Sequence, residues 1–292
     1  MKGAKWLWAL VLWLFTVAVI AGVSAALRRP WTPPGDPPRL GNRPDQCEAL
    51  NLLPGSSSGI ILEPQNTWSN SAYLLAGLLI VFYARQPLAR ALGAGSIVLA
   101  ISSALYHATL QDNSSPAFDA RTLDVAAMYA VLWLLLAYAV SCGFTHRRWS
   151  VPGEWTVSAL LAVLAYGMAR YRYNVWIFSS TPAVLSLIAA TAVLCLWQMY
   201  RLRPPSARWY LLAFTIAGAA AATFRFGDGN GRWLCRPYAP IQPHAIWHVA
   251  SAALLFLAYD FFAGTSPLGF TDAPFLPAQS LPKRKQENAG GS

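Results

Sequence analysis

The stretch Gln242-Pro243-His244-Ala245-Ile246-Trp247-His248 opens an apolar run that extends to Phe262. A run of this length is typical of a helix that crosses a membrane, and Pro243 suits the first turn of such a helix. Two histidines four residues apart lie on the same helix face, one turn from each other. Ionisable side chains are costly inside a bilayer and usually have a function there. The stretch therefore predicts a membrane helix that carries two imidazoles near one end.

The composition extends this prediction to the rest of the chain. Of the 292 residues, 55% are hydrophobic and only 12% are charged, whereas about a quarter of the residues of a soluble domain are charged. The run at 241–262 is preceded by further apolar runs at 66–84, 90–109, 122–143, 154–170, 176–199 and 207–225. These runs are continuous and do not alternate, which disfavours a membrane β-barrel. We predict an all-α membrane protein with a seven-helix bundle over residues 66–262.

The segments outside the predicted bundle differ from it in composition. Residues 1–27 combine a basic start with an apolar stretch, which fits a cleaved signal peptide or a retained signal anchor, the latter being an additional N-terminal helix. Residues 28–65 are rich in Pro, Gly and Ser and are expected to form an irregular extracytoplasmic segment. Residues 263–292 carry a basic cluster and are predicted to be a disordered tail.

The net charge of +10 comes from Lys and Arg residues scattered through short loops. They form no stripe of the kind that binds nucleic acid, so we interpret them as juxtamembrane anchors and topology signals. Their distribution slightly favours a cytoplasmic C-terminus. We therefore expect a multi-pass integral membrane protein whose partners are lipids and not nucleic acids.

Helix parity brings polar residues from distant runs to one side of the membrane. Ser103 and His107 are four residues apart at the end of the second run and share a helix face, and Asp124 opens the third run. The end of the second run and the starts of the third and seventh lie on the same side. These residues are therefore expected to meet the two histidines of the seventh run. The fourth histidine, His146, is expected on the other side.

This set of residues predicts a catalytic zinc site. Three neutral imidazoles with one open coordination position are a known ligand set of catalytic zinc, so His107, His244 and His248 are the candidate ligands. Asp124 could serve as general base and acid, and the Ser103 hydroxyl could donate to a developing oxyanion. Such a site would hydrolyse an amide or ester bond of a lipid, and that side of the membrane would be extracytoplasmic.

Each of these residues also has a simpler interpretation. Two histidines four residues apart are a weak motif on their own. Ser103 suits helix packing in a membrane, and Asp124 suits the start of a helix. The hydrolase interpretation depends on their convergence and not on any single residue.

Three separated blocks resemble the alkaline ceramidase family, within a superfamily of seven-helix membrane hydrolases that includes adiponectin-receptor-like proteins. The blocks are Cys47-Glu48 with Glu63-Pro64-Gln65-Asn66-Thr67-Trp68-Ser69-Asn70, then Ser103-x-x-x-His107-Ala108-Thr109-Leu110 with Leu123-Asp124 and Met128-Tyr129, and finally His244-Ala245-x-Trp247-His248. The resemblance implies that the three histidines bind zinc and that Ser103 and Asp124 serve the chemistry. It implies hydrolysis of the amide bond of ceramide to a sphingoid base and a fatty acid.

The first block implies a second metal. By the resemblance, Asp45, Glu48 and Glu63 would bind calcium, an ion that prefers clustered oxygen ligands. A solvated acidic loop is the alternative. The spacing from Cys47 to Glu63 is longer here than is usual in the family.

The cysteines fall into two pairs. Cys142 and Cys195 lie in apolar runs and are interpreted as small hydrophobic residues. Cys47 and Cys235 lie in loops on the site side, and a disulfide between them is expected if that side is extracytoplasmic. Two unpaired thiols are the alternative.

Three functions fit these observations. The first is an intramembrane zinc-dependent amidase that acts on ceramide. The second is a hydrolase or remodelling factor for another lipid on the same scaffold. The third is a receptor-like protein in which zinc only joins helices. A structural zinc site would need neither Ser103 nor Asp124, so these residues favour a hydrolase. A transporter is disfavoured because no paired repeats or broken helices are apparent in the sequence.

Overall fold

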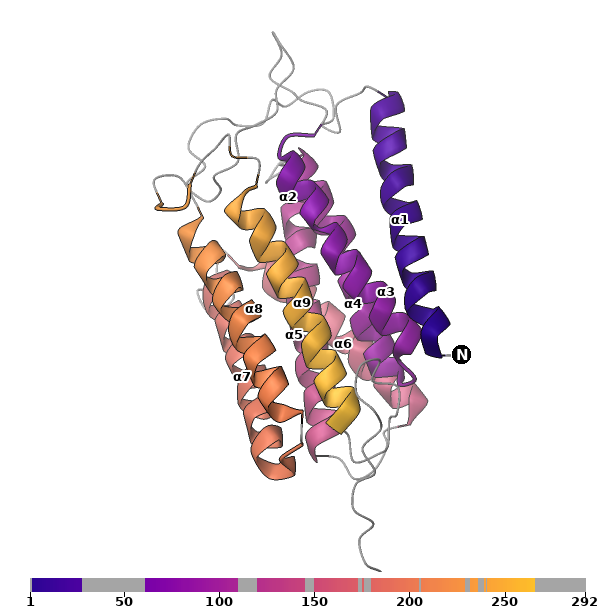
Figure 1. The fold of residues 1–292 in the computed structure, drawn as a ribbon, viewed down its shortest axis with the longest axis vertical. Coiled ribbons are helices and arrows are strands. Elements are labelled where there is room, and N and C mark those ends of the chain that lie inside the picture. Colours follow the sequence, from indigo (N-terminus) through magenta and orange to yellow (C-terminus); the bar gives the residue numbers. More distant parts are fainter. Residues whose placement is uncertain are drawn as a thin grey trace, which may run out of the picture.

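The computed structural model is helical throughout the residues that it describes, with no strand among them (Figure 1). The described residues are 2–27, 61–109, 120–144, 150–172, 175, 180–204, 206–228, 232–235, 239 and 241–265. Asp45, Cys47 and Glu48 lie outside these ranges, as do His146 and the tail from residue 266 onward. The predictions made for them stay predictions.

Six helices within the described ranges are long and apolar enough to cross a membrane. They are α4 (Pro87–Thr109), α5 (Ala120–Phe144), α6 (Val151–Arg170), α7 (Ser180–Leu202), α8 (Ala207–Gly227) and α9 (Pro243–Thr265). Their bounds agree with the last six predicted runs to within four residues, because long apolar stretches define the helices. A multi-pass helical membrane protein is thus confirmed in its coarse form.

The first predicted run, 66–84, is divided between α2 (Pro64–Ser69) and α3 (Ser71–Tyr83). Asn70 separates the two helices, although its dihedral angles stay in the right-handed helical region (φ −64°, ψ −16°). Local side-chain bonds compete with the helix ladder here. Asn70 Nδ2 and Ser69 Oγ both donate to the Asn66 carbonyl, at 2.8 and 2.9 Å. A seventh span as one continuous helix is therefore not observed.

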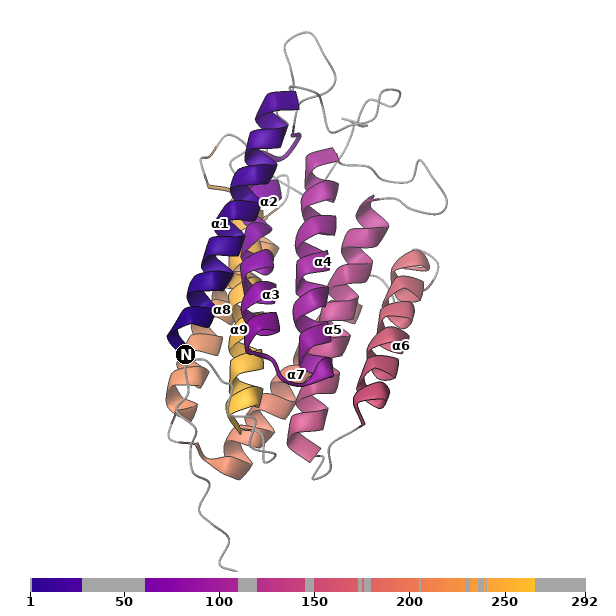
Figure 2. The ribbon, with the colours of Figure 1, turned by 90° about the vertical axis from the view of Figure 1, so that its right-hand side faces the viewer.

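The N-terminal helix α1 (Lys2–Leu27) packs against α3, as Figures 1 and 2 both show. The Trp13 indole N–H donates to the Ser71 carbonyl at 2.7 Å, and Ala9 is fully buried. The Lys5 ammonium lies 5.7 Å from the centroid of the Tyr83 ring. The choice between a retained anchor helix and a cleaved signal peptide stays a prediction.

Helices α4, α5 and α9 contribute much of the buried core, and α3 packs closely against α4. Two glycines permit this close approach. A Cβ atom on Gly77 would lie 2.7 Å from the Gly93 carbonyl oxygen and 2.8 Å from a side-chain carbon of Ile97. Small residues at such a crossing allow membrane helices to pack through their backbones. Helices α3 and α4 are thus closely packed where Gly77 meets Gly93.

Backbone contacts tie the chain before α2 to the end of α4. The Leu62 N–H donates to the Ala108 carbonyl at 3.1 Å, and the Glu63 N–H donates to the His107 carbonyl at 3.2 Å. Helix α2 itself packs against α4 and α9. The end of α4, the start of α9 and α2 therefore meet at one end of the bundle.

Candidate metal centre

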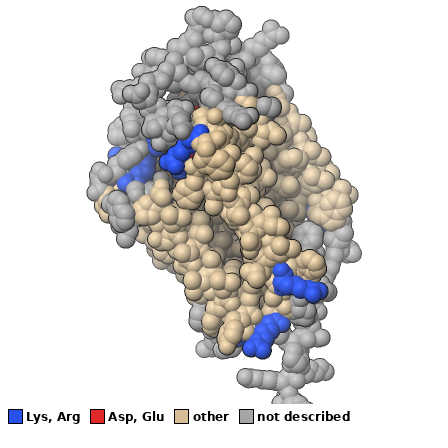
Figure 3. Space-filling view, turned by 60° about the vertical axis from the view of Figure 1, so that its left-hand side comes forward, with Lys and Arg blue, Asp and Glu red and all other residues tan. Residues whose placement is uncertain are grey.

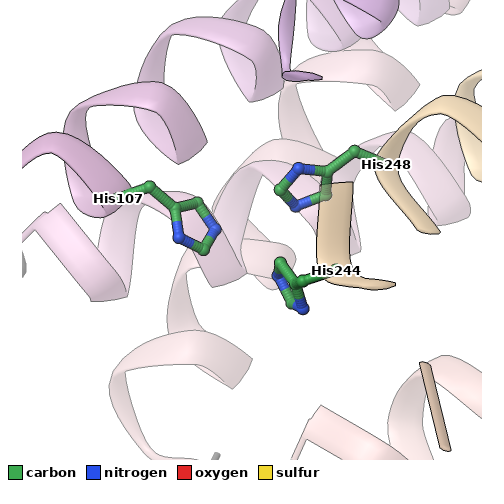
Figure 4. A group of neighbouring side chains, drawn as sticks. All are labelled: His107, His244 and His248. Carbon is green, nitrogen blue, oxygen red and sulfur yellow. The ribbon is translucent and has the colours of Figure 1, made fainter. Parts of the chain in front are cut away.

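Three histidine rings lie together where α4 ends and α9 begins (Figure 4). The ring centroids of His107 and His244 are 5.1 Å apart, those of His107 and His248 are 5.2 Å apart, and those of His244 and His248 are 4.6 Å apart. Each ring offers a nitrogen, and these atoms all lie within 4.8 Å of one another. All three side chains are buried. The convergence expected from helix parity is thus observed, while zinc binding stays a prediction.

Carboxylates hold the outer side of two of these rings. His107 Nδ1 lies 2.7 Å from Glu63 Oε2, and His244 Nδ1 lies 3.0 Å from Asp228 Oδ2. An ionised carboxylate can only accept a hydrogen bond, so the ring proton is assigned to Nδ1 in both histidines. The lone pair of Nε2 is then available to a metal. Carboxylate–histidine pairs of this kind are typical of metal-binding imidazoles.

The third ring is held by a serine. Ser69 Oγ lies 2.8 Å from His248 Nδ1 and donates its single proton to the Asn66 carbonyl, 2.9 Å away. With the hydroxyl proton assigned to this carbonyl, the hydroxyl oxygen accepts a hydrogen bond from His248 Nδ1. The same tautomer follows as for the other two histidines. In all three rings the Nε2 lone pair thus stays available to a metal ion. Three imidazole nitrogens are a known ligand set of zinc.

Glu63 makes a contact with the histidine cluster that the sequence did not predict. It is 2% exposed, and its Oε2 accepts hydrogen bonds from His107 and also from Asn66 Nδ2 at 3.2 Å. A role in orienting His107 follows directly from these contacts. Its proposed role as a calcium ligand needs Asp45 and Glu48, which lie outside the described residues, and stays a prediction.

Ser103 and Asp124 lie beside the histidines. Ser103 is buried one turn before His107 in α4, and Asp124 lies in the first turns of the neighbouring helix α5. Their side chains are within hydrogen-bonding reach of each other, and the Asp124 carboxylate is close enough to His107 to interact with it electrostatically. The two residues proposed for the chemistry therefore accompany the proposed ligands.

Arginines flank Asp124. Arg172 is buried and donates to Thr122 Oγ1 at 2.8 Å and to the Ala169 carbonyl at 2.7 Å. The Arg121 guanidinium lies 6.0 Å from the centroid of the Tyr106 ring. Both cations interact electrostatically with Asp124. Their positive charges offset part of the cost of burying the Asp124 carboxylate.

The orienting roles of Glu63, Asp228 and Ser69 were missed from the sequence. Asp228 directly follows the sixth apolar run on the site side, and Ser69 belongs to the first block of the resemblance. Those positions alone could have marked them as neighbours of the cluster. The hydrogen bonds to the ring nitrogens require side-chain geometry.

The cysteines of the membrane helices behave as predicted, since Cys142 and Cys195 are buried and neither forms a disulfide. No disulfide joins two of the residues that the structure describes. The predicted Cys47–Cys235 bond includes one residue outside those ranges and stays a prediction.

The fold and the cluster define a class: an all-helical, multi-pass membrane protein with three buried histidines that could hold one metal ion. No model of a known protein family matches the chain, and no curated protein matches it either. The resemblance to the alkaline ceramidases therefore rests on the three sequence blocks.

Proposed function

We propose that the protein is an intramembrane zinc-dependent amidase that hydrolyses the N-acyl bond of ceramide or of a related N-acyl lipid. One observation carries this proposal: three buried histidines present Nε2 to a common space while Glu63, Asp228 and Ser69 hold each Nδ1. A water-poor cluster of three neutral imidazoles suits a divalent metal. The neighbouring Ser103 and Asp124 favour a catalytic site over a purely structural one.

His107, His244 and His248 would hold zinc through Nε2. Three protein ligands leave a fourth position open, the arrangement typical of catalytic zinc. When bound, zinc would polarise the amide carbonyl and lower the pKa of a water molecule to about 7. The hydrogen bonds at Nδ1 keep the rings in the required tautomer and increase their basicity.

Asp124 and Ser103 supply the proton transfers and the oxyanion contact. The Asp124 carboxylate accepts a proton from the attacking water as the new C–O bond forms. The Ser103 hydroxyl, within reach of Asp124, donates to the carbonyl oxygen as negative charge develops on it. Asp124 then returns its proton to the nitrogen as the C–N bond breaks. The products are a fatty acid and a free amine.

The outer surface of α7 and α8 supports a lipid substrate. In Figure 3 this face carries Lys and Arg only at its two ends, and it is hollowed near the middle. Val193, Trp209 and Ile216 are exposed apolar side chains on these helices. Apolar surface of this kind is suited to acyl chains, so a substrate that arrives from the bilayer fits this surface better than a soluble one.

The finer topology is part of the proposal. Residues 64–83 are helical on both sides of Asn70, and a segment of this length spans about 30 Å at 1.5 Å per residue. We count α2 and α3 together as the first of seven spans, with α1 as an additional N-terminal helix. The site face is extracytoplasmic and the C-terminus cytoplasmic. Calcium at Asp45, Glu48 and Glu63 and the Cys47–Cys235 disulfide complete that face.

Metal removal tests the proposed function. Purified full-length protein is expected to contain one zinc ion and to release fatty acid from labelled ceramide. Chelation should abolish release, and added Zn²⁺ should restore it. His244→Ala should remove both zinc and activity, whereas His146→Ala, the same change at the remaining histidine, should preserve both.

Two outcomes would contradict the amidase. Hydrolysis that persists after complete metal removal would exclude a zinc mechanism. Chelation could instead lower the thermal stability of a protein that cleaves no lipid in a panel of amides and esters. The metal ion would then have a structural role and would only join helices. Cleavage of another lipid with ceramide untouched would keep the zinc hydrolase and change its substrate.

A further inference from the structure

Arg225 lies beside the histidine cluster but takes no part in the proposed chemistry. Its guanidinium carbon lies 5.9 Å from the centroid of the Trp247 ring. That ring lies 5.0 Å from the His244 ring and 5.1 Å from the His248 ring, measured between centroids. Arg225 is also close enough to His244 to interact with it electrostatically. Arg225 is therefore a permanent cation that is separated from the proposed metal ligands by the Trp247 ring alone.

Arg225 differs from the other arginines at this end in its contacts. Arg172 donates to Thr122 and Ala169, and the exposed Arg232 donates to the Phe226 carbonyl at 3.3 Å. Within the described part of the chain, Arg225 makes no hydrogen bond or ion pair, and its guanidinium lies over the face of the Trp247 ring. It is nevertheless half-buried. A partly desolvated guanidinium is costly unless an anion completes its hydrogen bonds.

The charges around the cluster favour an anionic ligand. Among the described residues, three carboxylates surround the rings: Glu63, Asp124 and Asp228. Three guanidinium groups balance them: Arg121, Arg172 and Arg225. A divalent ion at the histidines would make the site net positive, and a water-poor setting strengthens its field. A neutral substrate would not compensate this positive charge, whereas an anionic one would.

We propose that Arg225 binds an anionic group, a carboxylate or phosphate, in the head of the lipid whose amide is cleaved. This rests on the proposed amidase function and ranks its substrates: N-acyl lipids with an acidic head group are preferred over neutral ones such as ceramide. The planar guanidinium can donate two parallel hydrogen bonds to such a group. Trp247 supports its flat face and fixes its position relative to His244 and His248.

Two substrates that differ only in the acidic group test the proposal. N-palmitoyl serine carries a carboxylate, and N-palmitoyl serinol carries a hydroxymethyl group in its place. The zinc-loaded full-length protein is expected to prefer the serine amide. Arg225→Gln should lower kcat/KM for the serine amide by about 10- to 100-fold and leave the serinol amide unchanged. Arg225→Lys should fall between, because lysine keeps the charge without the planar fork.

Arg232→Gln is the matched control, since it removes the same charge from the same end of the bundle. It should leave the ratio of the two kcat/KM values unchanged, and zinc content should be equal in all variants. Equal losses on both substrates in Arg225→Gln, or a wild-type preference for the serinol amide, would overturn the proposal. The proposal would also be overturned if Arg225→Gln changed only the inhibition of the enzyme by palmitate. That result would show that Arg225 binds the carboxylate of the released fatty acid and not the head group of the substrate.

A binding measurement separates this inference from the amidase itself. If neither amide nor ceramide is cleaved, the proposed function fails, but uncleaved N-palmitoyl serine can still raise the thermal stability of the protein. A stabilisation by the serine amide that Arg225→Gln abolishes, with no such difference for the serinol amide, would support the anion site. Equal stabilisation of both proteins would overturn it.

Discussion

The bundle buries polar side chains at both ends, and the two groups are organised differently. At one end, three imidazoles each offer one ring nitrogen, and these atoms all lie within 4.8 Å of one another. At the other end, each donor meets an acceptor. The Tyr210 hydroxyl donates to the Asp260 carboxylate, and Gln198 Nε2 donates to Thr265 Oγ1 at 2.9 Å. The first group gathers lone pairs, and the second consists of donor–acceptor pairs between helices.

This difference separates a site from a structural contact. Asp260 is 2% exposed, so its burial in an apolar helix would by itself suggest a function. Its bond to Tyr210 instead links α9 to α8, and Gln198 links α7 to α9, as polar residues do in membrane bundles. The lone pairs of the histidines repel one another unless a cation lies between them. Convergence of acceptors, and not burial alone, marks the end of the bundle that could hold a metal ion.

The largest contrast is expected from removing one ligand. His248→Ala takes a nitrogen from the cluster, so zinc content should fall from one ion per chain to none, and hydrolysis should fall to background. Tyr210→Phe at the other end should keep both. Elemental analysis of the purified variants and a fatty-acid release assay provide the measurements. Loss of zinc in Tyr210→Phe would contradict the conclusion that only the histidine end of the bundle binds the metal ion.

Asp124→Asn tests the proton transfers separately from the metal. The amide cannot accept and return a proton, so kcat should fall by about 10²- to 10⁴-fold while zinc content stays the same. Asp260→Asn makes the same isosteric change in a buried carboxylate at the opposite end. It should leave kcat per folded molecule unchanged. Equal losses in the two variants would show that Asp124 acts through folding and not through chemistry.

A smaller effect is expected from the residues that orient the rings. Asp228→Asn weakens the hydrogen bond at His244 Nδ1, and a loss of about 10- to 100-fold in zinc affinity or activity should follow. Zinc affinity can be measured by competition with a chromophoric chelator. Glu154→Gln is the control, because the buried Glu154 accepts from the Leu88 N–H at 2.9 Å, away from the histidines. A matching loss of affinity in that variant would argue against a local role for Asp228.

The smallest effect concerns stability. Tyr210→Phe removes one buried hydrogen bond between α8 and α9, at a cost of about 1 kcal/mol. The variant should unfold at a lower temperature in detergent, with kcat and zinc content unchanged. An unaltered Tm would show that the Tyr210–Asp260 contact does not stabilise the bundle.

The parts of the molecule that follow from hydropathy and parity were predictable. The bounds of α4 to α9 depend on long apolar stretches, and His107, His244 and His248 meet because helices of known parity end on one side. The break at Asn70 was not predictable, since it results from local side-chain bonds to the Asn66 carbonyl inside an apolar run.

The orienting residues escaped prediction for another reason. Glu63 was assigned to calcium because the resemblance supplied a role for it before its neighbours were known. Asp228 and Ser69 are ordinary loop and helix-end residues in the sequence, and only their distances to the ring nitrogens reveal what they do. Hydropathy orders helices along the chain but carries no information about which side chain faces which.

The hydrogen bond between Ser69 and His248 joins residues 179 positions apart in the chain. Ser69 belongs to the first helix of the bundle proper, and His248 belongs to the last helix that the structure describes. During synthesis, α9 leaves the ribosome after every other described helix. The histidine cluster can therefore be complete only once the whole bundle has been inserted. A partly made chain would hold a single one of the three imidazoles, so metal binding and the proposed hydrolysis could begin only after α9 is in place.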